Sequence, residues 1–163
     1  TLVKGGGNMT KNIIKRFSIA LNQEIIDTSD LRIIFADNDT SLRSTFRKHI
    51  ETLAKQNHLK FDIIECKDGA DLLYCLYNHY LENKPIDALL FDENMDFISG
   101  TVLVEILSIL FKRSVLPDIT VMMTTDYEIT PSQYKFLHHI TKPVDYNSIK
   151  KNMQHLLTTQ NNK

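Results

Sequence analysis

The sequence is poor in the residues on which several specialised folds and sites depend. Its 163 residues include two cysteines, five glycines, four prolines and no tryptophan. Two cysteines, Cys66 and Cys75, are too few for a disulfide framework or a zinc cluster, so we expect buried free thiols in a reducing compartment. No apolar run reaches the ~18–20 residues that span a bilayer. We therefore expect a cytoplasmic domain that does not have a membrane as its partner.

The charge is nearly balanced, which excludes a second group of partners. The 19 basic and 20 acidic residues give a formal net charge of −1. This balance gives no electrostatic reason to expect nucleic acid as the main partner. Hydrophobic residues make up 42% of the chain and charged residues 24%, which is ordinary for a globular protein. A chain of this length is expected to form about one domain with a real core.

The N-terminal part of the chain differs from the rest. Residues 1–8 contain three consecutive glycines and are typical of a linker or a cloning remnant. In residues 10–26, apolar side chains at helical spacing predict one amphipathic helix, which we interpret as a connector to an upstream domain. We therefore assign residues 1–30 to a linker and helix, residues 31–158 to the main domain, and residues 159–163 to a tail.

Within the main domain, strand and helix patterns alternate. Apolar and β-branched runs predict strands over residues 31–37, 61–66, 86–92, 118–124 and 137–141. Helical spacing predicts helices over residues 40–56, 70–81, 101–111 and 148–157. This alternation predicts an α/β fold with a doubly wound, five-stranded parallel sheet in the flavodoxin-like order 2-1-3-4-5. An eight-stranded barrel is excluded because it needs ~250 residues.

Polar residues of a particular kind stand at the carboxyl ends of four predicted strands. These ends converge on one edge of an open parallel sheet, where ligands bind. The residues concerned are Asp37 and Asp39 after the first strand, Asp92 after the third, Thr124 after the fourth and Lys142 after the fifth. Three carboxylates, a hydroxyl and an ammonium group in one pocket can hold a hard divalent cation and take up a phosphoryl group.

Each of these residues also has a simpler interpretation when it is taken alone. Asp92 can be a solvated aspartate at the end of a strand. Asp39 can cap the following helix, for which Thr40 and Ser41 are the expected N-cap residues. The shared position of the residues at successive strand ends is the stronger evidence, because like charges gathered without a cation would repel one another.

Residues 31–157 resemble response-regulator receiver domains, the CheY-like superfamily. The resemblance is carried by Asp37-Asn38, by Asp92 eight residues before Gly100, by Thr124 and by Lys142-Pro143. The segment FDENMDFISG is its most specific part, and the letters ENM within it are similar to receivers of eukaryotic hybrid histidine kinases.

The resemblance implies a phospho-accepting domain of a two-component phosphorelay. It implies that Asp92 attacks a phosphoryl group that a phosphohistidine delivers. The donor would be a histidine kinase or a histidine phosphotransfer protein. It also implies Mg²⁺, or Mn²⁺, held by Asp37, Asn38, Asp39, Asp92 and the backbone carbonyl of Asn94.

Further roles and partners follow from the same resemblance. Lys142 and Thr124 would share the phosphoryl oxygens with the metal, and Thr124 would turn towards the new phosphoryl group to switch the conformation. A receiver of this kind assists its own phosphorylation and dephosphorylation. A kinase domain in the same polypeptide, a position on the cytoplasmic side of a membrane-anchored kinase, and a homodimer are further expectations.

The sequence departs from the pattern of the family in four places. Asn38 stands where an acidic metal ligand is usual, so the metal site loses a charge. Asp96 replaces the usual proline four residues after the phospho-acceptor. Thr125 stands where a small residue is common, and we expect it to narrow access for a donor. The stretch 126–137 is short, so we expect a stunted helix between the fourth and fifth strands.

Three residues occupy positions that tune or switch receivers. His139 lies three residues before Lys142, at the aromatic switch position, although a plain surface histidine is an equal alternative. Asn94 and Asp126 lie two residues after the acceptor and two after Thr124, where the lifetime of the phosphoryl group is set. Because both are small or polar, we expect an aspartyl phosphate that lasts minutes rather than days.

Two other classes of function remain open. The stretch from Asp37 to Ser41 resembles the nucleophile loop of haloacid-dehalogenase-type phosphatases, in which Asp37 would be the nucleophile and Asp39 the general acid. The second alternative is a degenerate receiver that binds partners without phosphorylation, which Asn38 and Asp96 favour. A flavin-binding flavodoxin is disfavoured because the loop after the first strand lacks a phosphate-binding run of Ser, Thr and Gly.

Overall fold

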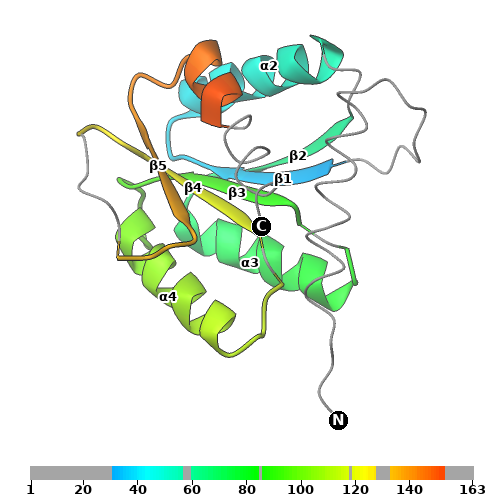
Figure 1. Ribbon diagram of the computed structural model, residues 1–163, viewed down its shortest axis with the longest axis vertical. Coiled ribbons are helices and arrows are strands. Elements are labelled where there is room, and N and C mark those ends of the chain that lie inside the picture. Colours follow the sequence, from blue (N-terminus) through cyan, green and yellow to red (C-terminus); the bar gives the residue numbers. More distant parts are fainter. Residues whose placement is uncertain (1–30, 57–59, 85, 118, 128–132, 153–163) are drawn as a thin grey trace.

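The computed structural model describes residues 31–56, 60–84, 86–117, 119–127 and 133–152. The expected linker and helix in residues 1–30 and the tail at 159–163 lie outside the described residues, drawn as a grey trace in Figure 1. No helix among the described residues is long and apolar enough to cross a membrane.

Five parallel strands form one sheet in the order β2-β1-β3-β4-β5. The strands are β1 (Leu31–Ala36), β2 (Phe61–Cys66), β3 (Ala88–Asp92), β4 (Thr120–Thr125) and β5 (Leu137–Thr141). The doubly wound order predicted from the sequence is therefore confirmed.

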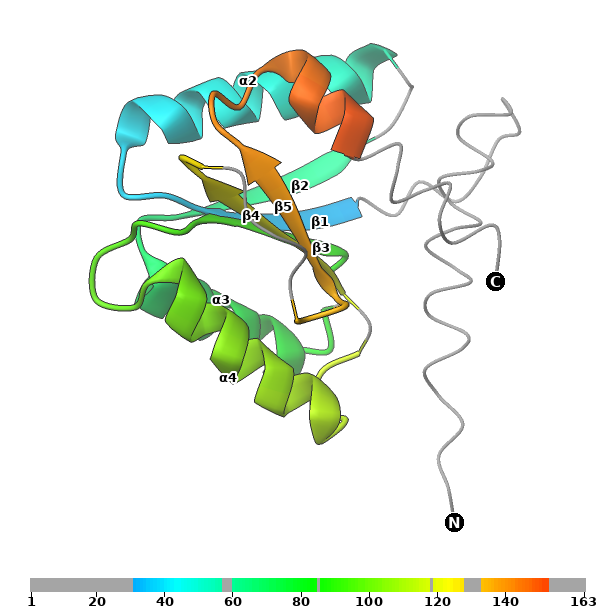
Figure 2. The same cartoon turned by 60° about the vertical axis from the view of Figure 1, so that its left-hand side comes forward.

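Helices cover both faces of this sheet. They are α2 (Thr40–Gln56), α3 (Gly69–Leu81) and α4 (Gly100–Lys112), and residues 146–152 are also helical. Figures 1 and 2 show α2 and the segment 146–152 on one face, and α3 and α4 on the other. The last helix begins two residues earlier than predicted, and its predicted end at residue 157 lies outside the described part of the chain.

The core consists of two apolar layers, one on each face of the sheet. Side chains of β1 alternate between them, as the period of a strand requires. Ile34 and Ala36 face the layer under α3 and α4, whereas Ile33 and Phe35 face the layer under α2. All five residues of β3 are buried because this central strand is covered on both sides. Burial of each large apolar side chain contributes about 1.5–3 kcal/mol.

Helix α2 begins differently from the sequence prediction. The N-cap is Asp39, whose Oδ1 accepts hydrogen bonds from the backbone N–H groups of Ser41 at 2.7 Å and Leu42 at 3.4 Å. Thr40 already belongs to the helix, so the prediction of Thr40 or Ser41 as the cap was wrong. Leu42 was expected in the buried stripe but is 41% exposed, because it lies in the first turn, at the open edge of the sheet.

The connection between β4 and β5 is short. None of its described residues, 126–127 and 133–136, is helical, and the stunted helix expected there stays a prediction. Phe136 packs against Phe111 of α4 with ring centroids 4.9 Å apart, so an aromatic contact holds this connection against α4. Residues 128–132 lie outside the described range.

Candidate functional site

Strand register brings four of the predicted site residues to one edge of the sheet. Strands β1 and β3 are parallel neighbours that end in register just before Asp37 and at Asp92. Asp92 pairs directly with Thr124 on β4. Strand β5 ends in register with β4, one residue before Lys142. The edge predicted from the strand ends therefore exists.

Asp92 lies at the centre of this edge and is only 2% exposed. Its Oδ1 accepts a hydrogen bond from the hydroxyl of Thr124 at 3.1 Å and lies 2.9 Å from Nζ of Lys142. Two donors therefore hold one carboxylate oxygen in a fixed direction. Among the described residues these side-chain contacts are made to Oδ1, so Oδ2 is the oxygen that is left to react.

The ammonium group of Lys142 balances the carboxylates of the site. Burial lowers the pKa of Lys142, but the hydrogen bond and charge of Asp92 raise it, with smaller contributions from Asp126 and Asp37. The net pKa is raised, so Lys142 stays protonated at neutral pH.

Asp37 is buried next to this pair, with 3% of its surface exposed. Its Oδ1 accepts a hydrogen bond from the backbone N–H of Asp39 at 2.8 Å. Burial raises the pKa of Asp37, and the nearby charge of Asp92 raises it further, although the Asp39 N–H and Lys142 act in the opposite direction. The charge of Asp92 thus adds to the effect of burial on the pKa of Asp37.

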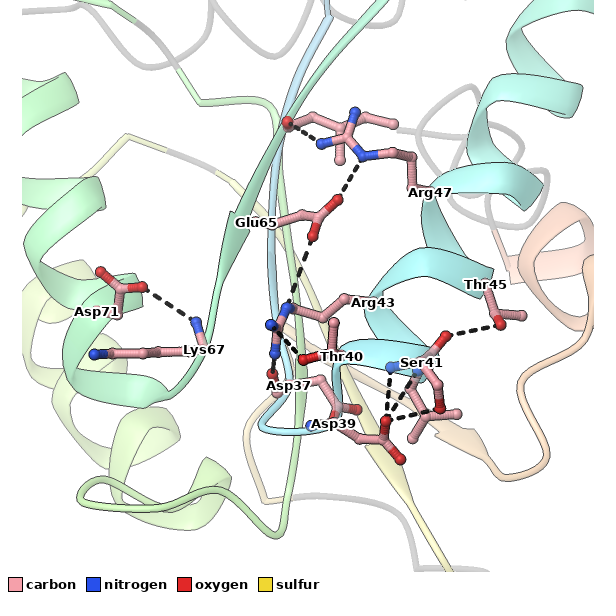
Figure 3. A network of polar contacts seen from close by, with 12 residues as sticks. Asp37, Asp39, Thr40, Ser41, Arg43, Thr45, Arg47, Glu65, Lys67 and Asp71 are labelled. Carbon is pink, nitrogen blue, oxygen red and sulfur yellow. Dashed lines mark hydrogen bonds and ion pairs between the residues drawn. The ribbon is translucent and has the colours of Figure 1, made fainter.

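Asp39 is directed towards the helix. Besides the two backbone N–H groups, its Oδ1 accepts the hydroxyl of Ser41 at 2.8 Å, and this bond lowers the pKa of Asp39 (Figure 3). Asp37, Asp39 and Asp92 are not among the described groups of three ligands whose atoms all lie within 4.8 Å. These contacts favour the capping interpretation of Asp39 over a role as a direct metal ligand.

Arg43 belongs to the site although the sequence analysis did not identify it. Its guanidinium donates to the backbone carbonyl of Asp37 at 2.6 Å and to the hydroxyl of Thr40 at 3.0 Å, and its Nε lies 3.7 Å from Glu65 on β2 (Figure 3). Arg43 thus fixes the loop that carries Asp37 and Asn38. In the sequence, the only indication of this role is that Arg43 lies four residues after the helix cap, Asp39, and so one turn along α2.

The two lifetime-tuning positions contact each other across the site. The side-chain amide of Asn94 donates to Asp126 at 3.1 Å, and Asp126 also lies 3.8 Å from Nζ of Lys142. Thr125 is buried and donates its hydroxyl to the carbonyl of Tyr127 at 2.7 Å. We still predict that Thr125 narrows the access of a phosphoryl donor to Asp92. We also still predict that Asn94 and Asp126 set the lifetime of the aspartyl phosphate.

His139 is not a plain surface histidine. It is partly buried on β5, and both ring nitrogens are enclosed without a hydrogen-bond partner among the described residues. Burial lowers the pKa of His139, while the charge of Glu93 raises it by a smaller amount. The surface interpretation is therefore wrong, and the switch role stays a prediction.

Gly100 allows α4 to begin directly against the backbone of Asp92. A Cβ atom at this position would lie 2.8 Å from the carbonyl oxygen of Asp92 and 2.7 Å from Cα of Glu93. Such contacts are too close for any larger residue, so the glycine is required here by packing. Ser99 caps the helix by accepting the backbone N–H of Val102.

A pocket of about 520 Å³ opens at this edge of the sheet. Asp37, Asp126 and Lys142 form its polar end, and its apolar wall includes side chains of α2 and of the segment after β5. Its lining consists of Phe35, Asp37, Leu42, Thr45, Phe46, Leu90, Thr124, Asp126, Lys142, Pro143 and Val144. A ligand in this pocket can therefore reach Asp37, Thr124 and Lys142 from solvent.

We expect Asp37→Asn to stabilise the metal-free protein at neutral pH, because it removes a buried negative charge near Asp92. Because the folded-state pKa of Asp37 is raised above its ordinary value of 3.8, its favourable contribution is complete below that pH and is lost as the pH rises through the folded pKa. Asparagine keeps an oxygen for the Asp39 N–H but removes the charge.

Urea unfolding in EDTA tests this expectation, with Asp96→Asn as the control because Asp96 is an exposed acid in the loop after β3. The advantage of Asp37→Asn should vanish below about pH 4, where the carboxyl is protonated in the folded and the unfolded protein. A variant that is less stable than the wild type at pH 7 would show that the buried charge is not in conflict.

No protein-family model matches the sequence. No curated protein matches it either. The fold, in contrast, matches solved structures of receiver domains. A two-component response regulator from Cytophaga hutchinsonii aligns with a TM-score of 0.64 at 16% identity, over 78% of this chain and 96% of that chain. The two-component transcriptional regulator AraC from Clostridium phytofermentans aligns with a TM-score of 0.60 at 23% identity, over 80% and 95% of the two chains.

A eukaryotic receiver matches as well. The receiver domain of the response regulator Ssk1 from Saccharomyces cerevisiae, co-crystallised with the histidine phosphotransfer signalling protein Ypd1, aligns with a TM-score of 0.56 at 9% identity. The alignment covers 83% of this chain and 94% of that one. The chain therefore has the fold of response-regulator receiver domains, as the sequence predicted. At these identities the likeness establishes the fold alone.

Proposed function

We propose that this chain is a phospho-accepting receiver domain of a two-component phosphorelay, and that Asp92 is the acceptor. The observation that carries the proposal is the contact set of Asp92. One carboxylate oxygen is held by Lys142 at 2.9 Å and Thr124 at 3.1 Å, and both of these residues line a pocket at the strand ends. A nucleophile on a rigid strand with its charge balanced by a fixed ammonium group suits in-line phosphoryl transfer.

The residues of this chain act mainly by positioning and by charge. The Oδ2 atom of Asp92 forms a bond to phosphorus while the bond between phosphorus and the donor histidine nitrogen breaks, and that nitrogen leaves with the electron pair. Lys142 then pairs with the negative phosphoryl oxygens, and the Thr124 hydroxyl can donate to them after it leaves Asp92. This exchange of partners by Thr124 is the proposed start of the conformational switch.

A divalent cation is part of the proposal. The hard oxygens of Asp37, Asp92, the Asn38 amide and the backbone carbonyl of Asn94 are of the kind that Mg²⁺ or Mn²⁺ prefers. The raised pKa of Asp37 supports a cation here, because a cation relieves the repulsion between the two buried carboxylates. When bound, the cation would neutralise negative charge on the transferring group. Asp39 contributes less directly, since its oxygen caps α2.

The proposed donor is a phosphohistidine on a histidine kinase or a histidine phosphotransfer protein. The fold match to a receiver co-crystallised with a phosphotransfer protein supports the second type of donor. We also propose an upstream kinase domain in the same polypeptide, as in eukaryotic hybrid histidine kinases. The support is the segment Glu93-Asn94-Met95 after β3, which is similar to receivers of that class. A homodimer remains a further proposal.

A phosphorylation-independent docking module is the second candidate. It is favoured by the neutral Asn38 and by the capping role of Asp39, which together leave two carboxylates in the predicted metal site. The phosphatase alternative loses support, because an Asp39 held by the helix N-terminus is poorly placed to serve as a general acid.

Phosphoryl uptake from acetyl phosphate separates the two candidates without any knowledge of the natural donor. The full chain is incubated with acetyl phosphate in Mg²⁺ or in EDTA, and its intact mass is measured. We expect one phosphoryl unit in Mg²⁺ and none in EDTA. No uptake in Mg²⁺, together with no Mg²⁺ binding at millimolar concentration, would overturn the receiver proposal in favour of the docking module.

A further inference from the structure

A second group of ligating side chains lies between β2 and α3, apart from the site formed by Asp37, Asp92 and Lys142. Cys66, Asp71 and Cys75 each offer one ligand atom, and these atoms all lie within 4.8 Å of one another. Cys66 is the last residue of β2 and is 1% exposed. Asp71 and Cys75 lie on α3 and are partly exposed. Both cysteines are free thiols, so both sulfur atoms are available to a ligand.

The arrangement follows from the geometry of the two elements. Residues four apart on a helix project from the same face, which places Asp71 and Cys75 one above the other. The turn between β2 and α3 is short, because Asp68 caps the helix two residues after Cys66. The strand end is therefore held against the first turns of the helix. This explains how two cysteines that are too few for a zinc cluster by count still meet a third ligand.

The carboxylate of Asp71 is already oriented. Its Oδ2 accepts the backbone N–H of Lys67 at 3.1 Å, as Figure 3 shows. A hydrogen bond of this kind fixes the direction of a ligating carboxylate. Asp71 and Cys75 are both partly exposed, so the group is not sealed from solvent. Three protein ligands and an open fourth position are typical of a tetrahedral zinc site that is not fully enclosed by protein.

The ligand types select the ion. Two sulfur ligands exclude Mg²⁺ and Ca²⁺, which require oxygen, and they favour thiophilic ions. A mixed set of two thiolates and one carboxylate matches the borderline character of Zn²⁺. We propose that Cys66, Asp71 and Cys75 form a Zn²⁺ site that is separate from the phosphoryl site.

Binding at this site releases protons. Each thiol gives its proton to the solvent and its sulfur lone pair to the metal, with no oxidation or reduction. Burial raises the pKa of the Cys66 thiol, and its contact with Cys75 adds to this effect, so Cys66 is a neutral thiol when no metal is bound. The metal then takes the place of the thiol protons.

The proposed Zn²⁺ site is connected to the loop that carries Asp37. The backbone carbonyl of Cys66 accepts the N–H of Asp37 at 3.2 Å. An ion that fixes the end of β2 would therefore also support the backbone from which Asp37 projects. The proposal does not depend on phosphorylation, and its test needs no phosphoryl donor.

Metal titration of the reduced full chain tests the proposal. Co²⁺ serves as a spectroscopic substitute, and Zn²⁺ is measured by its displacement of Co²⁺. We expect one equivalent of Co²⁺ with thiolate charge-transfer bands and the intense visible bands of tetrahedral coordination. Cys75→Ser should weaken the Zn²⁺ affinity by more than about 100-fold, because loss of a ligand costs more than loss of an outer-shell partner. Asp71→Asn should weaken it as well.

Glu82→Gln is the matched control for the loss of a carboxylate, because Glu82 is exposed at the other end of α3 and pairs with Lys84. Circular dichroism and thermal unfolding establish that each variant is folded before the titration. A second readout is independent of the variants: bound Zn²⁺ should protect the Cys75 thiol of the wild type from alkylation.

Several results would overturn the site. The first is the absence of thiolate charge-transfer bands when the wild type is titrated with micromolar Co²⁺. The second is an unchanged Zn²⁺ affinity in folded Cys75→Ser, or a Zn²⁺ affinity of Glu82→Gln as low as that of Asp71→Asn. The third is a rate of Cys75 alkylation that is the same with and without Zn²⁺. Conversion of the reduced protein to a Cys66–Cys75 disulfide in the presence of Zn²⁺ would also contradict the proposal, because bound thiolates are shielded from oxidation.

Discussion

The Asp92→Asn variant is expected to take up no phosphoryl group from acetyl phosphate and Mg²⁺, while the wild type takes up one. An amide is a far weaker nucleophile than a carboxylate and does not form a stable acyl phosphate. Asparagine is nearly the same size as aspartate and keeps an oxygen that can accept from Lys142 and Thr124. The fold should therefore persist, and intact mass should report a loss of reactivity rather than a loss of structure.

Asp96→Asn is the matched control for this prediction. Asp96 lies four residues further along the same loop, and its side chain is exposed. Its conversion to asparagine should leave phosphoryl uptake close to that of the wild type. Uptake that persists in Asp92→Asn would mean that another residue is the acceptor, and Asp37 would be the first to examine.

The Lys142→Met variant should lose both stability and phosphoryl uptake. Methionine keeps the length of the side chain but removes the ammonium group 2.9 Å from Asp92, whose side chain is almost fully buried. Removal of one partner of a buried ion pair costs about 3 kcal/mol, because the other charge remains without compensation. Uptake should fall by roughly 10²–10³-fold, the usual effect of removing one donor from a developing negative charge.

Two comparisons identify the cause of the Lys142 effect. Lys48→Met on the exposed side of α2 should change neither quantity, since Lys48 lies outside the site. The stability loss in Lys142→Met should shrink as the pH falls, because the carboxylates then take up protons and no longer need a cation. Urea unfolding from pH 7 to pH 4 measures this trend. A loss that is independent of pH would contradict the electrostatic explanation.

The sequence predicted the positions of Asp37, Asp92, Thr124 and Lys142 because each follows a buried strand. In a parallel sheet the direction of the strands alone brings such residues to one edge. The predicted strand boundaries lie within about two residues of the observed ones, so the residues at this edge of the sheet were identified correctly. The order of the strands was predictable for the same reason, since alternating short strands and single helices leave few arrangements.

The details that the sequence did not reveal depend on direction and distance within the fold. Asp39 follows a strand as Asp37 does, yet its side chain turns to the first N–H groups of α2, and no pattern of residue types separates these two outcomes. Arg43 acts through a backbone carbonyl, which a sequence pattern does not display. His139 occupies an alternating position on β5, and only the packing around it encloses the ring.

The group of Cys66, Asp71 and Cys75 shows the same limit from the other side. Cysteine counting excluded a zinc cluster because counting assumes that the ligands are mostly cysteine. The third ligand is an aspartate, and it joins the two sulfurs only because α3 begins directly after β2. The spacing of four residues on the helix was visible in the sequence, but the approach of the strand end to that face was not.

The central claim is that Asp92 carries the phosphoryl group, and chemical trapping tests it most directly. The chain is incubated with acetyl phosphate and Mg²⁺, reduced with borohydride, which converts an acyl phosphate of aspartate to homoserine, and digested for peptide mass spectrometry. The account predicts homoserine at position 92 and at no other aspartate. Homoserine at position 37, or an unmodified Asp92 in a sample that has gained a phosphoryl unit, would contradict it.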